Sequence, residues 1–414
     1  MDVLEGSEIP IHSVVRSPAK MDQICSEEDV CDIRNNSAQA ESSQYLQSER
    51  IIITIIIPLI LGIGVPVNGV FIFVVARLRH MRTVTNVFLI NLAVSDMCFM
   101  TVTTGDTLGR YLSSPVTFDC TGLGTLGCCL VQFLQNTFFY ASIFVVTAVT
   151  LEKFYCVCKP VRHRLISGKK RTVKYVAIVW VLAITFALVL IPAHGQYVVY
   201  TIIWPKEAIY SDFPTQVGYC QSVSVVWDVV SNGIQTIPFF AVLSINIYMY
   251  VRICNVLTRR VRSSIGSIAG NERFHNIINT RSQKVKNQCV RMLVINGVVF
   301  FCLLSPFHFF ALSQLIGRFV SDTYLLDAYT LRRMVWAFRV LNYINTAVNP
   351  FVYILSNARY RRAFFVAIPC LKLLCLRSRP HGPPTTATIV ESTVDKCDQA
   401  SSLEAISYIS RDEQ

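Results

Sequence analysis

Charged residues are scarce in this sequence. Only 15% of its 414 residues are Asp, Glu, Lys or Arg, whereas 52% are hydrophobic and the mean hydropathy is +0.45. This balance excludes an ordinary soluble globular domain. The sequence also lacks a cluster of metal ligands, a nucleophile–base pair and a phosphate-binding loop. It therefore predicts no enzyme, no catalytic residues and no organic cofactor.

A secretory signal is missing as well. Residues 1–50 are polar and hold ten of the acidic residues, so the first apolar run has to act as the targeting signal. Their composition predicts a disordered extracellular tail over residues 1–50. Asn35 begins an Asn-Asn-Ser sequon in this tail and is a candidate glycosylation site.

Long apolar runs are the main positive feature. Runs of about 20 residues have the length of membrane spans. Seven of them predict an all-α membrane protein, a seven-transmembrane helix bundle over residues 51–355. No inverted repeat or pair of broken helices is visible, which argues against a seven-span transporter. The predicted spans are 51–76, 85–107, 125–151, 174–194, 224–252, 288–314 and 332–355.

The basic residues predict the orientation. Of 38 Lys and Arg residues, 28 lie in the first, third and fifth connecting loops, at the helix ends beside them and in the C-terminal tail. Positive residues stay on the cytoplasmic side, so the N-terminus is expected outside a plasma membrane that the chain crosses several times. Because these residues are scattered beside spans, they indicate contact with lipid headgroups and not with nucleic acid.

Two motifs near the ends of spans carry a family resemblance. Asn349-Pro350 lies inside the last run, although proline removes a backbone hydrogen bond there, and Tyr353 follows. Glu152-Lys153-Phe154 ends the third run. The chain resembles the rhodopsin-like G-protein-coupled receptors, and among them the receptors for neuropeptides of the thyrotropin-releasing-hormone, neuromedin and ghrelin type. The resemblance implies a heterotrimeric G protein as partner.

The resemblance assigns G-protein coupling to Glu152, Lys153, Phe154 and Tyr353. The family pattern has Arg where this chain has Lys153. Arginine is a planar fork of donors and lysine a point charge on a flexible stem, so the exchange is not neutral. Two alternatives remain: a signalling receptor with altered coupling, or a weakly signalling or decoy receptor.

The resemblance also implies a disulfide between Cys128 and Cys220. Cys129, the neighbour of Cys128, is the competing partner. A second bridge, between Cys25 and Cys31, stays open because sequence does not settle connectivity.

Polar residues inside the spans form a second implied site. A carboxylate in a span is costly without a partner. The family places a buried sodium ion among the residues that correspond to Asp96, Ser142, Asn345 and Asn349, with Asn68 of the first span at a similar depth. The alternative is a hydrogen-bonded network without an ion.

The outer halves of the spans predict a ligand site. Amine receptors carry Asp where Gln135 stands and opsins carry Lys where Tyr343 stands, so neither ligand class is expected. Asp106 and Arg339 either pair with each other or await charged groups of a peptide. Residues 196–205 and 217–220 predict a hairpin, a lid that goes with peptide ligands in this family. The predicted ligand-binding residues are Asp106, Gln135, Asn136, His308, Arg339 and Tyr343.

Basic and apolar residues alternate after the last span. Residues 356–376 predict a short amphipathic eighth helix on the inner leaflet. Cys370 and Cys375 follow at a depth suited to palmitoylation, or are plain thiols. Residues 377–414 predict a disordered cytoplasmic tail whose Ser and Thr residues are phosphosites of the kind that recruit arrestin.

Overall fold

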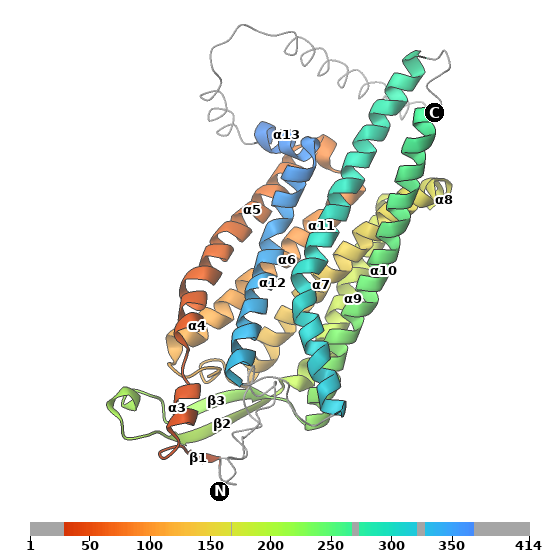
Figure 1. Cartoon of the computed structure of the whole chain (residues 1–414). Coiled ribbons are helices and arrows are strands. Elements are labelled where there is room, and N and C mark those ends of the chain that lie inside the picture. The colour runs from red at the N-terminus through yellow and green to blue at the C-terminus, as the bar shows by residue number, and fades with distance from the viewer. Residues whose placement is uncertain (1–28, 167, 267–272, 321–327, 368–414) are drawn as a thin grey trace, which may run out of the picture. The chain divides into compact units, whose positions relative to one another are not determined.

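The computed structural model describes residues 29–166, 168–266, 273–320 and 328–367. A bundle of seven long helices forms most of this part of the chain (Figure 1). The first consists of α4, a π-helical turn (η1) and α5 in direct succession. The bounds are α4 Gln47–Ile51, η1 Ile52–Ile56, α5 Ile57–Arg77, α6 Val84–Ser113, α7 Gly124–Cys158, α9 Lys169–Val189, α10 Val225–Gly266, α11 Arg273–Val320 and α12 Ala328–Ser356.

Membrane-spanning character holds for most of these helices. Within the described residues, six are long and apolar enough to cross a membrane. The remaining long helix, α12, has Arg332, Arg333 and Arg339 in its first half, which lowers its hydropathy. It nevertheless packs against α5, α6 and α11 as a full member of the bundle. The predicted seven-helix bundle is confirmed.

Several helices are longer than their apolar runs. Most of the segment between the predicted spans 224–252 and 288–314 is helical, because α10 continues to Gly266 and α11 begins at Arg273. Figure 1 shows both helices extending past the bundle. Hydropathy detects only the part of a helix that suits lipid, whereas backbone hydrogen bonds continue beyond it into water.

A three-stranded sheet lies at one end of the bundle, which we call the hairpin end (Figure 1). Strand β2 (Gln196–Ile203) pairs antiparallel with β3 (Gln216–Gln221), which confirms the predicted hairpin. Strand β1 (Val30–Asp32) pairs parallel with β2. Apolar side chains of this sheet form a small core of their own around Cys31, Tyr200 and Trp204.

The predicted disordered tail is wrong for residues 29–50, and residues 1–28 lie outside the described residues. Besides β1, this part contains α3 (Ser37–Ser42), where the Asn36 side chain accepts a hydrogen bond from the Gln39 amide. We call residues 29–50 the N-terminal segment. Two of its few large apolar residues are buried by contacts outside the segment, Ile33 against the hairpin and Tyr45 against the bundle.

The opposite end of the bundle carries α13 (Ala358–Ala367), and we call it the α13 end. Tyr360 and Phe364 are buried against the bundle while Arg361 and Arg362 are exposed. This arrangement matches the first part of the amphipathic helix predicted over residues 356–376. Residues 368–414, with Cys370, Cys375 and the predicted tail, lie outside the described residues.

Candidate functional site

A cavity of about 300 Å³ lies inside the bundle near the hairpin end. Side chains of α6, α7, α10, α11 and α12 line it, and β3 contributes Tyr219 and Cys220. Counting helical turns from the motifs within the spans predicts which residues face inward. All six predicted ligand-binding residues line this cavity: Asp106, Gln135, Asn136, His308, Arg339 and Tyr343.

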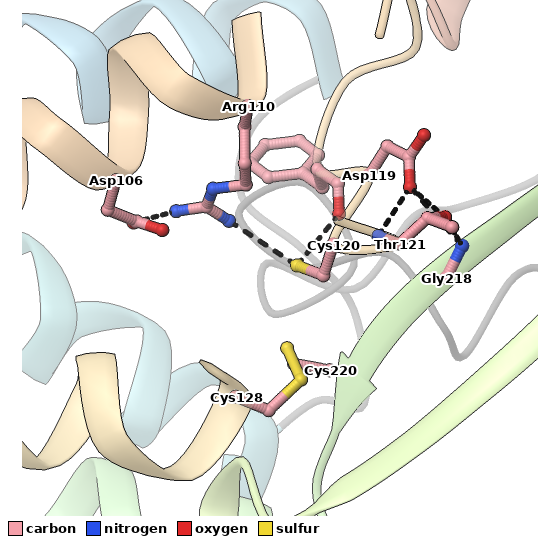
Figure 2. The surroundings of a disulfide bond; sticks show 9 residues. Asp106, Arg110, Asp119, Cys120, Thr121, Cys128, Gly218 and Cys220 are labelled. Carbon is pink, nitrogen blue, oxygen red and sulfur yellow. Dashed lines mark hydrogen bonds and ion pairs between the residues drawn. A yellow bond between two sulfur atoms is a disulfide. The ribbon is translucent and has the colours of Figure 1, made fainter. Parts of the chain in front are cut away.

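One wall of the cavity carries an internal ion pair. Asp106 pairs with Arg110, four residues later on α6, and also accepts a hydrogen bond of 3.2 Å from Gln135 Nε2. In Figure 2 the Arg110 guanidinium lies between Asp106 and Cys120, whose Sγ is 3.6 Å from Arg110 Nη1. The alternative that Asp106 pairs with Arg339 is therefore wrong. The i, i+4 spacing of an acid and an arginine on one helix was the available signal.

Helix α12 brings a different cation to the cavity. Arg339 of α12 lies over the Trp336 ring, 5.0 Å from its centroid. No ion pair with a carboxylate is found for Arg339 within the part of the chain that the structure describes. Tyr343, one turn further along α12, is buried with Trp336 in one apolar cluster. Among the described residues, the cavity thus holds one arginine in an ion pair and one that lies over an aromatic ring without an ion-pair partner.

His308 lies among aromatic rings in the cavity wall. Its imidazole stacks on Phe239 with centroids 3.8 Å apart and an interplanar angle of 11°. It is 1% exposed, and neither ring nitrogen has a hydrogen-bond partner among the described residues. Buried polar atoms rarely lack a hydrogen-bond partner. A polar group of a ligand could therefore form a hydrogen bond with His308. Asn136, in contrast, donates its amide to Gln132 O at 2.9 Å.

The hairpin is tied to the bundle by the predicted disulfide. Cys128 of α7 and Cys220 of β3 form it (Figure 2). Cys129 is a free thiol. Asp119 adds a second link, since its carboxylate accepts hydrogen bonds from the Thr121 and Gly218 amides. Cys31 is also disulfide-bonded, and Cys25, its proposed partner, lies outside the described residues. The disulfide holds β3 at the cavity wall.

The N-terminal segment is attached to the bundle at the hairpin end, which the polar composition of residues 1–50 does not predict. The Arg332 guanidinium of α12 forms a buried ion pair with Glu49 and donates to Ser42 O at 2.6 Å. Thr117, in the loop after α6, donates its amide to Ser43 O at 2.9 Å. In the sequence, Glu49 is only one acidic residue of a polar tail, because its partner Arg332 lies 283 residues further along the chain.

The predicted cation site is a compact polar cluster deep in the bundle. Asp96 is 0% exposed. One of its carboxylate oxygens accepts a hydrogen bond from Ser142 at 2.8 Å, and the other accepts one from Asn349 at 2.7 Å. The side-chain carbonyl oxygens of Asn345 and Asn68 are buried without a hydrogen-bond partner within the described residues. The structure thus joins Asp96, Ser142 and Asn349 directly, and Asn345 lies one turn before Asn349 on α12.

At the α13 end, the predicted coupling residues take separate partners. Lys153 Nζ donates to the Thr85 hydroxyl of α6, a neutral acceptor. Glu152 does not pair with Lys153 but with His163 of α8 (Pro160–Ile166), at 2.7 Å. Phe154 packs on a cluster formed by Val157, Ile253 and Val290 of α7, α10 and α11.

Tyr353 connects α12 to the neighbouring helices. It is 1% exposed and contacts the rings of Phe71 in α5 and Tyr360 in α13. Its hydroxyl has no hydrogen-bond partner in the described part of the chain. A tyrosine held by ring packing alone, with its hydroxyl unused, can change position without breaking a polar contact.

The candidate glycosylation site Asn35 is exposed, in the turn between β1 and α3 at the hairpin end. Its acceptor amide is therefore accessible from the same end as the ligand cavity. Whether it carries a glycan stays a prediction.

Comparison with known proteins places the chain among membrane receptors. The sequence profile described as 7 transmembrane receptor (rhodopsin family) matches residues 67–353. Neuromedin-U receptor 2 of Mus musculus is 27% identical over 344 residues, 81% of this chain and 80% of that protein. The thyrotropin-releasing hormone receptor of Gallus gallus is 25% identical over 364 residues, 80% and 83% of the two chains. Growth hormone secretagogue receptor type 1 of Oryctolagus cuniculus is 25% identical over 316 residues, which are 73% of this chain and 76% of that protein.

Proposed function

Because this chain belongs to the rhodopsin family of seven-transmembrane receptors, we propose that it binds an extracellular peptide in the cavity at the hairpin end and passes the signal to a heterotrimeric G protein at the α13 end. The observation that carries the proposal is the cavity itself. Its wall combines aromatic and polar side chains, and both α6 and α12 bring an arginine to it. Three similar proteins are named as receptors for neuromedin-U, for thyrotropin-releasing hormone and for growth hormone secretagogues.

The shape of the site supports a peptide in particular. A cavity of about 300 Å³ is at the lower end of small-molecule sites, so it takes one end of a peptide and not the whole. The hairpin contributes only Tyr219 and Cys220 of β3 to the wall and borders the cavity without filling it. The rest of a peptide would then lie along the hairpin.

The orientation in the membrane is part of the same proposal. The disulfide Cys128–Cys220 and the exposed Asn35 lie at the hairpin end, and both suit an oxidising, extracellular compartment. Arg359, Arg361 and Arg362 lie at the α13 end, where anionic lipid headgroups of the inner leaflet attract basic residues. We place the receptor in the plasma membrane with its N-terminus outside. Arrestin binding to the tail and palmitoylation of Cys370 or Cys375 belong to this proposal as well.

A neuropeptide library tests the proposal. Cells that express the chain are expected to respond to at least one peptide with a calcium or cyclic-AMP signal, and cells that express Arg339→Ala are expected to respond more weakly. Purified receptor should then accelerate nucleotide exchange on added G protein. A transporter would not accelerate nucleotide exchange. Responses confined to small non-peptide molecules would reject the proposal that the ligand is a peptide.

A weakly signalling receptor is the second candidate, and a specific contact favours it. Lys153 is held by one neutral hydroxyl, that of Thr85, and not by Glu152. A specific peptide binder that drives no nucleotide exchange would support this alternative.

The Asp96 cluster supports a bound sodium ion. Asp96, Ser142, Asn345 and Asn349 would hold it, and oxygen donors with one carboxylate suit a hard monovalent cation. The fit rests on the orphaned carbonyl oxygens of Asn345 and Asn68, because buried acceptors without partners favour a cation. A bound ion would neutralise the carboxylate and stabilise the resting arrangement of the helices.

Asp96→Asn separates the ion from a plain hydrogen-bond network. Peptide affinity of the wild type is expected to fall when sodium chloride replaces a choline salt, since sodium stabilises the resting state. The amide variant should lose that dependence. Radioligand competition in the two salts measures it, and an equal response of both proteins would leave only the network.

A further inference from the structure

A small recess adjoins the main cavity on the side of the N-terminal segment. It has a volume of about 20 Å³ and shares Thr107, Arg110 and Arg339 with the cavity. Tyr45 and Glu49 of the N-terminal segment form another part of its wall. A space of this size holds one water molecule or one small polar group.

The wall formed by the N-terminal segment is held firmly. Arg332 pairs with Glu49 and donates to the backbone carbonyls of Ser42 and Gln44, the latter at 2.7 Å. The Tyr45 ring packs edge-on against Tyr111 of α6, with centroids 5.1 Å apart. Because Tyr45 lies between these anchored residues, its side chain is a fixed part of the recess and not a passing contact.

The arginines around the recess differ in their partners. Arg110 is neutralised by Asp106, and Arg332 by Glu49. Asp119, a third carboxylate near Tyr45, accepts hydrogen bonds from the Thr121 and Gly218 amides. Arg339 lies over the Trp336 ring, and among the described residues it is the arginine at the recess without a carboxylate in ion-pair contact. A partly buried charge without a partner is costly, so an anion that enters the recess gains this interaction.

Tyr45 supplies the complementary donor. Its burial raises the pKa of the phenol to about 12, because the charged form would lose its hydration. It is therefore a neutral O–H donor at physiological pH. The structure shows no hydrogen bond for this hydroxyl within the described residues, so it is available to an acceptor.

We propose that the recess binds an acidic group of the ligand, a carboxylate, through the Arg339 guanidinium and the Tyr45 hydroxyl. The N-terminal segment is then part of the binding site and not only an attachment to it. The inference rests on the proposed function in one respect: the ligand enters this same cavity. It names the chemical class of the ligand group, a free C-terminus or an Asp or Glu side chain of a peptide.

Two matched probes test the proposal without knowledge of the natural ligand. N-acetylphenylalanine and N-acetylphenylalaninamide differ only in carboxylate against amide, and the aromatic ring suits the cavity wall. Each is added at millimolar concentration to purified full-length receptor, and the rise in thermal stability gives its affinity. The wild type is expected to bind the carboxylate at least about ten-fold more tightly, the lower end for a hydrogen bond to a charged group.

Variants assign that preference to the recess. Arg339→Gln should remove it, and Arg339→Lys should keep part of it. Tyr45→Phe, which keeps the ring packing on Tyr111, should reduce it by about ten-fold, the lower end for a hydrogen bond to a charged group. Arg333→Gln is the control, because Arg333 is an exposed arginine of the same helix.

Equal stabilisation by the two probes, including none by either, would overturn the proposal. So would a preference that survives in Arg339→Gln. A preference unchanged in Tyr45→Phe would remove the N-terminal segment from the site. These measurements involve no signalling. A negative peptide screen together with a positive probe result would therefore reject the proposed peptide ligand but retain the proposed carboxylate site.

Discussion

Replacing Lys153 with alanine is expected to abolish ligand-driven nucleotide exchange on the G protein while leaving ligand binding in place. Lys153 is the cation of the motif that ends α7, and a positive charge there is what the family uses for coupling. Loss of hydrogen bonds to a charged group, at about 1.5–3 kcal/mol each, corresponds to a fall of at least roughly ten-fold. Exchange on added G protein and surface expression are measured together.

Thr85→Val is the matched control for this prediction. It removes the resting partner of Lys153 but keeps the charge, so basal exchange should rise and the response to ligand should persist. Lys153→Arg should change the strength of coupling, because a guanidinium donates in a fixed plane and an ammonium does not. Full signalling by the alanine variant at normal surface expression would remove Lys153 from the coupling machinery.

Asp106→Asn is expected to destabilise the receptor strongly. The variant leaves Arg110 without its carboxylate, and the Arg110 side chain is only 18% exposed. Removing one partner of a buried ion pair costs about 3–5 kcal/mol, which is a large part of the stability of most proteins. Thermal unfolding of purified protein and the amount at the cell surface both report this loss.

The double variant Asp106→Asn, Arg110→Gln should recover much of the loss, since no uncompensated charge remains. Asp32→Asn is the control, because the Asp32–Arg34 pair is about half exposed and such pairs contribute little. Normal stability of Asp106→Asn alone would mean that Arg110 finds another partner. Recovery by Arg339→Gln instead of Arg110→Gln would mean that Asp106 acts across the cavity.

The cavity lining could be predicted because it depends on helical geometry. The motifs that end the third and seventh spans anchor them, and a period of 3.6 residues then places Gln135 and Tyr343 on inward faces. Pro306 inside α11 does the same for His308. The hairpin could also be predicted from local chemistry, because its β-branched residues favour an extended backbone. The Asp106–Arg110 ion pair differs from the predicted alternative, which paired Asp106 with Arg339 on another helix. The i, i+4 spacing of the two charges on α6 is a local signal for the pair that forms.

The sequence by itself determined the elements that depend on local chemistry: the apolar spans, the hairpin, the start of the amphipathic helix and the inward faces of the bundle. Only the tertiary structure decided which polar groups meet. Asp106 pairs within α6, Lys153 contacts Thr85, and Glu49 meets Arg332 from far along the chain. The order of the N-terminal segment has the same origin. Its residues have little apolar surface to bury alone, so their structure comes from contacts with α12 and the hairpin that no local pattern contains.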